Sequence, residues 1–152
     1  MPAVLRAYGS DFDVDELLAG CTLPLCAVKR RGEPVFPLSQ PDGLRHDRSG
    51  VHVTVSDADF SEFPRQIAEA TTFLQSEADQ VRRLCRWPGV EAVDLDFGIE
   101  RRDVMVQCDR LPPALVRLAG SLGLGIELSH YCASGDEPGA KPGGARDRGG
   151  GR

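Results

Sequence analysis

Aromatic residues are scarce in this chain, and an excess of positive charge is missing. Phe, Trp and Tyr make up 6% of the 152 residues, so a hydrophobic core must rest mainly on Leu, Val, Ile and Ala. The formal net charge is −5. A protein that holds nucleic acid or an anionic membrane depends on a positive field, which this composition lacks. We therefore expect neither nucleic acid nor membrane as a partner.

Long hydrophobic runs are also missing. No stretch approaches the ~18–20 apolar residues of a membrane-spanning helix, and the opening MPAVLRAYGSDFD lacks the apolar core of a signal peptide. We predict a cytoplasmic protein. Its five cysteines are then expected to be reduced thiols, and their odd, scattered distribution argues against a disulfide framework.

The familiar catalytic motifs are absent as well. There is no Walker loop and no GxGxxG, and GSLGLG ends a predicted helix, whereas a phosphate-binding loop precedes one. His52 lies on a predicted strand without a nucleophile elbow, so a half-exposed strand histidine is the favoured interpretation. We predict no catalytic residue and no cofactor. Enzymatic activity stays an open question, with a non-enzyme favoured.

The residues that are present suit one folded domain, which we assign to residues 1–132. Hydrophobic residues make up 41% of the chain, enough for a core. The remaining segment, 133–152, is rich in Gly, Pro and Arg and nearly free of apolar side chains, so we predict a disordered tail. That segment has a net charge of +1, which leaves −6 on residues 1–132.

Hydrophobic periodicity predicts the elements of this domain. Alternation with a period of two predicts strands, and apolar steps of three and four predict helices. The expected strands are Ala3–Tyr8, short segments on both sides of the RRGEP turn, Val51–Ser56, VEAVDLDFGIE, VMVQC and Ile126–Tyr131. The expected helices run from Asp13 to Gly20, from Ser61 to Arg86 and onward from Pro112-Pro113, and Ser39–Gly50 is expected to be a loop.

Together these elements predict an α+β fold. Because polar and apolar residues alternate along the strands, one side of the sheet should be buried, with helices mainly on that face. The predicted sheet is mixed or antiparallel. Its elements follow a broadly ferredoxin-like β-α-β-β-α-β-β-α-β order.

Several local patterns resemble a known family. They are GSDFDVDELLAG after the first strand, LPLCAVKRRGEP, the long middle helix, and the ending LPPALVRLAGSLGLGIELSHY. Over Val4 to Tyr131 they are similar to a bacterial family catalogued as domain of unknown function 4279. The resemblance implies a fold, and it transfers no activity and no functional residues, because that family has none assigned.

The cysteines make only a fragment of a metal site. Cys21 and Cys26 are separated by four residues, at the edge of zinc-ligand spacing, and a second pair would have to come from elsewhere. Cys85 and Cys108 align with apolar positions and are expected to be small core residues. His130–Cys132 is one short pair at a strand end. We therefore predict no metal site.

The basic turn Lys29-Arg30-Arg31 is the first candidate for partner binding. Three cations fall short of the roughly six to ten phosphate contacts of a strong nucleic-acid site. Charged residues at such turns commonly keep an edge solvated. A solvated turn is therefore the favoured interpretation, and contact with an anion or an acidic partner is the alternative.

Asp94 and Asp96 form the second candidate, and Trp87 is the third. Strand alternation places both carboxylates on one face, roughly 7 Å apart, where they could meet a basic partner, hold a metal or take part in acid–base chemistry. Glu127 and His52 would join them if their strands are neighbours. An exposed acidic face is the simpler interpretation. Trp87 follows the long helix, and we favour a role in covering the helix end over one as an interface anchor.

Three functions stay open at this point. We favour a small non-enzymatic module that binds another protein, of which an immunity or antitoxin type is one concrete version. Its partner would have a basic surface that meets Asp94, Asp96 and the acidic loop Asp57–Glu62. The alternatives are a metal-assisted hydrolase that uses these two carboxylates, and a domain that senses a small ligand in a pocket between sheet and helices.

Overall fold

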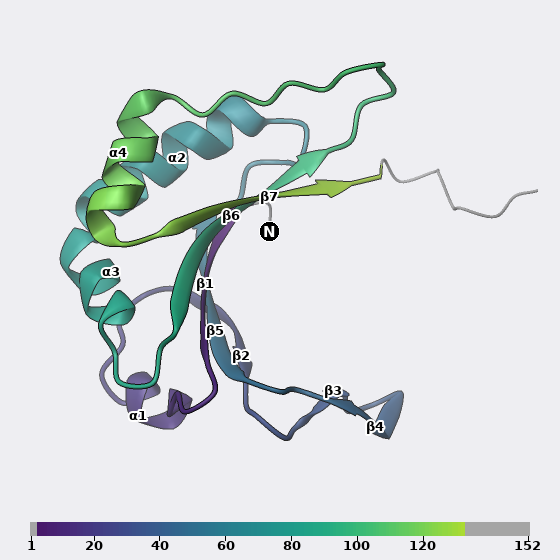
Figure 1. Cartoon of the computed structure of the whole chain (residues 1–152), viewed down its shortest axis with the longest axis vertical. Coiled ribbons are helices and arrows are strands. Elements are labelled where there is room, and N and C mark those ends of the chain that lie inside the picture. Colours follow the sequence, from purple (N-terminus) through teal and green to yellow (C-terminus); the bar gives the residue numbers. More distant parts are fainter. Residues whose placement is uncertain (1–2, 133–152) are drawn as a thin grey trace, which may run out of the picture.

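The computed structural model describes residues 3–132, which form seven strands and four helices (Figure 1). The strands are β1 (Ala3–Gly9), β2 (Leu25–Lys29), β3 (Pro34–Phe36), β4 (Gln40–Arg45), β5 (Ser49–Ser56), β6 (Ala92–Glu100) and β7 (Gly125–Tyr131). The helices are α1 (Val14–Leu18), α2 (Phe63–Ser76), α3 (Ala78–Cys85) and α4 (Pro113–Leu122). The predicted tail, 133–152, lies outside the described residues.

Five strands form one sheet, in the order β2-β5-β1-β6-β7. β1 is antiparallel to β5 and β6, β2 is antiparallel to β5, and β7 is parallel to β6. β3 and β4 make a separate hairpin. The predicted α+β class and mixed sheet are therefore confirmed. The ferredoxin-like order is not confirmed, since the elements follow one another as β-α-β-β-β-β-α-α-β-α-β.

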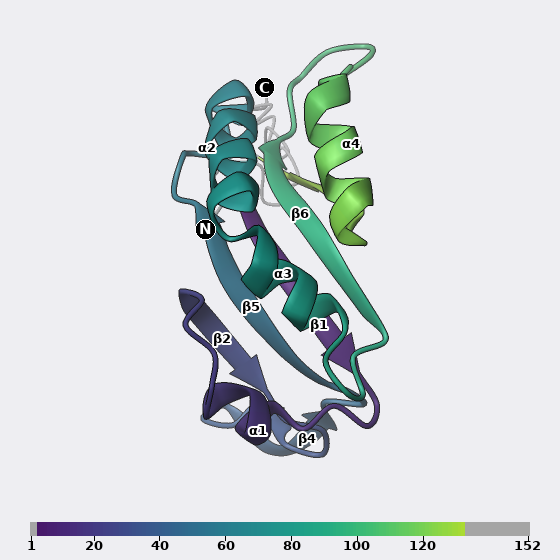
Figure 2. The same ribbon diagram turned by 90° about the vertical axis from the view of Figure 1, so that its left-hand side faces the viewer.

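One face of the sheet is buried beneath helices, as the alternation predicts. The side chains that β1, β5 and β6 turn to this face are almost completely buried, and include Leu5, Val51, Val53, Leu95 and Phe97. α2, α3 and α4 lie over it (Figures 1 and 2). Their core contribution includes Ala70, Leu74, Val81, Leu115 and Ala119. The other face of the sheet carries polar side chains such as Arg6, His52 and Asp94. No described helix covers this face (Figures 1 and 2).

The long helix expected from Ser61 to Arg86 begins later than predicted. α2 starts at Phe63, after Glu62 at the N-cap, and Pro64 lies in the first turn. Ser61 therefore lies before the N-cap. Its hydroxyl donates instead to the Asp59 carboxylate at 3.1 Å, which holds the loop before the helix.

The same helix is divided in two at Glu77. The Ser76 hydroxyl donates to the Phe73 carbonyl at 3.1 Å, and side-chain bonds of this kind to the preceding turn bend helices. The predicted apolar stripe continues across the division, because Leu74 and Val81 are both completely buried. Within residues 3–132, no helix is both long enough and apolar enough to span a membrane.

The loop expected over Ser39–Gly50 is a wrong prediction. β4 (Gln40–Arg45) lies inside this segment, and β5 begins at Ser49. β4 pairs with β3 in a hairpin that projects from the sheet, and every residue of β4 is exposed. A strand with both faces in solvent shows no alternation of polar and apolar residues, so periodicity does not detect it.

The strand expected at VMVQC is also absent, and Cys108 is not a core residue. The segment 101–112 connects β6 to α4, and Val104, Val106 and Cys108 are all exposed. The position beside β6 that this segment would need is taken by β7, which returns in parallel after α4. Alternation alone therefore predicted a strand whose expected place beside β6 is already occupied.

Candidate functional site

The uncovered sheet face is centred on Arg6, in the middle strand. In the register of the sheet, Arg6 lies between His52 of β5 and Asp94 of β6. Its guanidinium forms an ion pair with Asp96, and a longer one, at 3.5 Å, with Glu127 of β7. The four residues whose proximity the sequence left open thus gather on one face, around a cation that the sequence reasoning did not single out.

The two predicted carboxylates are already engaged by their own chain. Asp96 is only 3% exposed, and its charge is compensated by Arg6 and by the Ser129 hydroxyl, which donates at 2.7 Å. Asp94 accepts a hydrogen bond of 3.0 Å from the Tyr8 hydroxyl. This bond, together with burial, raises the pKa of Tyr8 above its ordinary value. Asp96 therefore presents almost no surface to a partner, whereas Asp94 stays half-exposed.

The geometry of this cluster does not favour a metal site. Among residues 3–132, no group of three or more His, Cys, Asp or Glu side chains is arranged to hold a metal ion. Asp94 turns to Tyr8 and Asp96 to Arg6, so each carboxylate has a protein partner. The predicted metal-assisted hydrolase consequently finds no support in this pair.

His52 lies on this face as an uncharged group at neutral pH. Burial, with the nearby charges of Lys29 and Arg6, lowers the pKa of His52 to about 4. The Cys26 thiol lies 3.4 Å from the His52 carbonyl oxygen. His52 is thus a neutral side chain beside two cations, and its environment disfavours protonation in the range where histidine ordinarily titrates.

Much of the predicted basic turn is held by contacts within the chain. Arg30 forms an ion pair of 2.5 Å with Asp15, one of two acids in the first turn of α1, and this pairing lowers the pKa of Asp15. Arg31 donates to the Ser10 carbonyl at 3.3 Å. Lys29 is half-buried at the end of β2. The cations of this solvated turn therefore also have a structural role, because Arg30 ties the end of β2 to α1 and Arg31 ties it to the β1–α1 connection.

Trp87 packs at the end of α3, in the role that we favoured. Its ring is half-buried against the core, and the Arg83 guanidinium lies 5.3 Å from the ring centre. The indole Nε1 is buried and has no hydrogen-bond partner within the described chain. Its function as an interface anchor stays a prediction.

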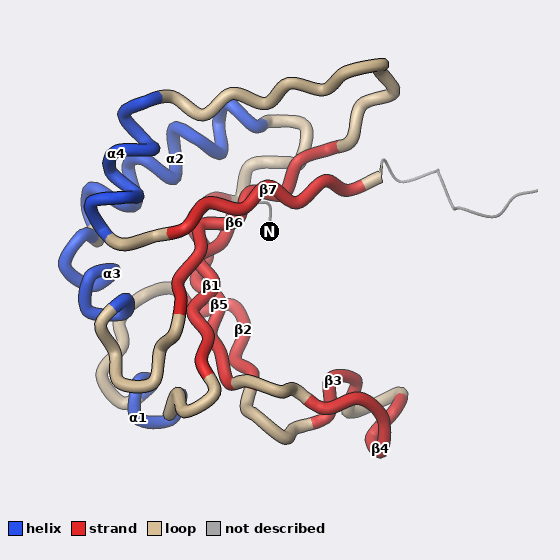
Figure 3. Tube along the Cα trace, viewed as in Figure 1, coloured by secondary structure: helices blue, strands red, loops and turns tan. Residues whose placement is uncertain are grey.

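Two segments project beyond the uncovered face, and both display apolar side chains. One is the β3–β4 hairpin, and the other is the 101–112 connection (Figures 1 and 3). Their exposed apolar residues are Phe36, Leu38 and Leu44 on the hairpin and Val104, Met105 and Val106 on the connection. Leu38 and Met105 are 99% and 101% exposed. We refer to the β3–β4 hairpin as the hairpin projection and to the 101–112 connection as the loop projection.

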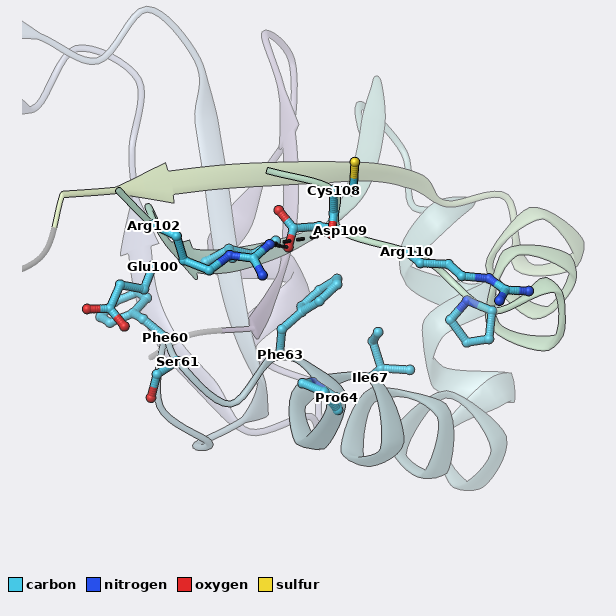
Figure 4. A pocket seen from close by; sticks show the side chains of 12 residues that line it. Phe60, Ser61, Phe63, Pro64, Ile67, Glu100, Arg102, Cys108, Asp109 and Arg110 are labelled. Atoms are coloured by element: carbon cyan, nitrogen blue, oxygen red, sulfur yellow. Dashed lines mark hydrogen bonds and ion pairs between the residues drawn. The ribbon is translucent and has the colours of Figure 1, made fainter. Parts of the chain in front are cut away.

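A cavity of about 580 Å³ lies where the loop projection passes over the start of α2 (Figure 4). Its apolar lining comes from the β5–α2 loop, α2, β6 and the turn before α4, and consists of Phe60, Phe63, Pro64, Ile67, Ile99 and Pro112. Its polar lining is Ser61, Glu100, Arg102, Cys108, Asp109 and Arg110. The sequence reasoning anticipated a pocket only in general terms, and placed none of these residues in it.

Asp109 is the ordered polar centre of this cavity. One carboxylate oxygen accepts from Arg102 at 2.9 Å, and the other accepts from Gln107 at 2.8 Å and lies 3.1 Å from His130 Nε2. Burial opposes ionisation, but these hydrogen bonds and the Arg102 charge outweigh it and lower the pKa of Asp109. Asp109 is therefore an ionised carboxylate whose oxygens are already satisfied.

Arg6, Tyr8 and Asp109 are the site residues that sequence reasoning missed. Arg6 and Asp96 are 90 residues apart, and only the pairing of β1 with β6 brings them together. A signal did exist for Arg6 and Tyr8, since both lie on the polar positions of the first predicted strand. For Asp109 there was none, because its segment was expected to follow a strand.

Comparisons with known proteins do not indicate a family or a function for this chain. The chain matches no family model, no curated protein and no solved structure. The resemblance to the uncharacterised bacterial family accordingly stays a prediction, and the candidate sites rest on geometry.

Proposed function

We propose that this protein is a non-enzymatic module that binds another protein between its hairpin and loop projections. The observation that supports this most is the exposure of six apolar side chains on two segments that extend beyond the same uncovered sheet face. Groups of exposed apolar side chains, such as the three on each projection, are typical of surfaces that meet a partner. Burial of side chains such as Leu38 and Met105 would supply contact energy at the two ends of the interface.

The proposed partner is a folded protein with a basic surface. The charge of the whole chain is −5 and that of residues 133–152 is +1, so residues 1–132 have a net charge of −6. Such a charge speeds encounter with a cationic protein through long-range attraction. On the uncovered face, Glu127, with a side chain 52% exposed, is more open than Asp96. An immunity or antitoxin role is one version of this proposal, and the cytoplasm is the location that we propose for it.

The test compares capture by the wild type with capture by the Leu38→Ser/Met105→Ser double variant, from a lysate of the organism that makes the protein. Proteins retained by each are measured by quantitative mass spectrometry. Val116→Ser is the matched control, because Val116 is an exposed valine on α4 and belongs to neither projection. We expect one cationic protein to be retained by the wild type and the control, and to be lost with the double variant.

Two results would count against this function. One is an equal loss with Val116→Ser, which would indicate general adhesion of apolar surface. The other is sedimentation of the purified wild type as a dimer that the double variant converts to a monomer, which would make the projections a self-association surface instead.

A further inference from the structure

The cavity beside the loop projection has the size and lining of a small-molecule site. Ligand pockets generally enclose about 300–1,000 Å³ and combine apolar walls with a few polar groups. Here the volume is about 580 Å³, and aromatic and aliphatic side chains line one side while charged groups line the other. This site is separate from the partner surface proposed above, which uses the outward side chains of the projections.

The apolar side of the cavity is firmly built. Phe63 packs edge-on against the buried Phe97, with ring centres 5.5 Å apart, and so cannot turn away from the cavity without disturbing the core. Ile67 on the next turn of α2 and Ile99 on β6 lie beside it. A hydrocarbon chain or ring placed here would leave water for surfaces that are already held in position.

The polar side does not favour a cationic ligand. Asp109 is the carboxylate that faces the cavity, and Arg102, Gln107 and His130 already contact both of its oxygens. An ammonium group would have to displace one of these partners. Glu100, the second carboxylate of the lining, points away from the cavity centre (Figure 4).

Arg110 is the free charge at the rim of this site nearest α4, where its side chain extends outward from the cavity centre (Figure 4). Within residues 3–132 its guanidinium has no hydrogen-bond or ion-pair partner, whereas Arg102 is held by Asp109. Guanidinium groups bind carboxylates through two parallel hydrogen bonds. The first turn of α2, which supplies Phe63 and Pro64 to the wall, adds the positive end of a helix dipole.

We propose that this cavity binds a small amphipathic carboxylate, with its hydrocarbon body against Phe63, Ile67 and Ile99 and its carboxylate paired with Arg110. Apolar walls and a free guanidinium at one side match a ligand with one anionic end. An uncharged or cationic ligand of the same length lacks the ion pair and binds more weakly.

The test uses octanoate as the probe, with 1-octanol and octylamine as its uncharged and cationic counterparts. Affinities are measured by calorimetry, and the site is located by chemical-shift changes of the Ile67 and Ile99 methyl groups. We expect octanoate to bind about tenfold or more tightly than 1-octanol, which is the effect expected for a hydrogen bond to a charged group. Arg110→Gln should bring octanoate down to the affinity of 1-octanol.

Arg117→Gln on α4 is the matched control, because it removes an exposed cation outside the lining and should leave octanoate binding unchanged. Ile67→Trp should fill the cavity and abolish binding of octanoate and 1-octanol alike, with circular dichroism to verify its fold. If that variant does not fold, the affinity of Arg110→Gln for octanoate and the methyl chemical shifts still test the proposal. The proposal is overturned if octanoate does not shift these methyl groups, if the three probes bind equally, or if Arg117→Gln weakens binding as much as Arg110→Gln.

Discussion

At the scale of single residues, the uncovered face shows how position in a sheet changes the meaning of a charge. Asp94 and Asp96 read as a pair of exposed acids in sequence, yet Asp96 is buried against Arg6 and Ser129. An ion pair of this kind contributes little net stability, but loss of one partner is costly because the other charge stays buried.

We therefore expect Arg6→Met to lower the free energy of unfolding by about 3 kcal/mol, because it leaves the Asp96 carboxylate buried with only Ser129 as a partner. Urea denaturation measures the change. Adding Asp96→Asn to Arg6→Met removes the uncompensated charge and should restore part of the loss. A double variant no more stable than Arg6→Met would show that the pair does not act in this way.

The low pKa of His52 gives a second prediction at this scale. Its pKa falls from the ordinary 6.5 to about 4 in the fold, so between these values the unfolded chain binds the extra proton and stability rises with pH. One pKa unit corresponds to about 1.4 kcal/mol, and partial exposure of the site reduces this. We expect the wild type to lose about 1 kcal/mol more than His52→Gln between pH 7 and pH 5.

Chemical denaturation at several pH values measures this difference. The carboxylates whose pKa values are lowered by the fold, such as Glu69, Glu91 and Asp109, affect stability at pH values below this window, so they do not mask the effect. Parallel pH profiles for the wild type and His52→Gln would contradict the assignment.

At the scale of elements, a close approach between two connections restricts which residue one of them accepts. The turn after α3 passes close to the β1–α1 connection at Gly89, whose φ is +80°. A Cβ built on Gly89 would lie 2.2 Å from the Asp11 carbonyl oxygen and 2.8 Å from the Phe12 Cα. This position therefore requires glycine both for its backbone conformation and for space.

Gly123, at the end of α4, has only the first of these two requirements. Its φ is +86°, but no atom lies within 4 Å of a built Cβ. We expect Gly123→Ala to cost about 1 kcal/mol, the strain of a left-handed residue. Gly89→Ala should cost about 3 kcal/mol, since steric overlap adds to that strain. Thermal or urea unfolding of both variants tests the comparison, and equal losses would show that the close approach to Asp11 is relaxed at little cost.

At the scale of the whole molecule, the helices lie on one side of the sheet, whereas the hairpin projection and the tip of the loop projection extend beyond the other side (Figure 1). Core packing is concentrated on the helix side, whereas the apolar groups of the projections add nothing to it. Stability and partner binding should therefore be separable by mutation.

The Leu38→Ser/Met105→Ser variant tests this separation directly. Because both side chains are fully exposed, their replacement should change the free energy of unfolding by no more than about 0.5 kcal/mol. Differential scanning calorimetry of the double variant and of Val116→Ser measures this. A large loss of stability would mean that the projections fold back on the domain, and would undermine their proposed role as a docking surface.

The sequence by itself determined the fold class, the buried face of the sheet and most element positions. Two local patterns made this possible: the polar–apolar alternation of β1, β5 and β6, and the apolar stripe of α2 and α3. Burial of one face selects apolar residues at fixed spacings along the chain, whichever segments provide the neighbours. The capping of α1 by Asp13, whose side chain accepts from Asp15 and Glu16, is local in the same sense. Such features can be predicted without the tertiary structure.

Only the tertiary structure decided the strand order, the hairpin of β3 and β4, and both candidate sites. The register of β1 against β6 brings Arg6 close to Asp96, and the return of β7 to pair with β6 denies VMVQC the place beside β6. The cavity likewise forms because the 101–112 connection crosses α2. These features depend on contacts between segments far apart in the chain, and periodicity contains no information about which segments meet.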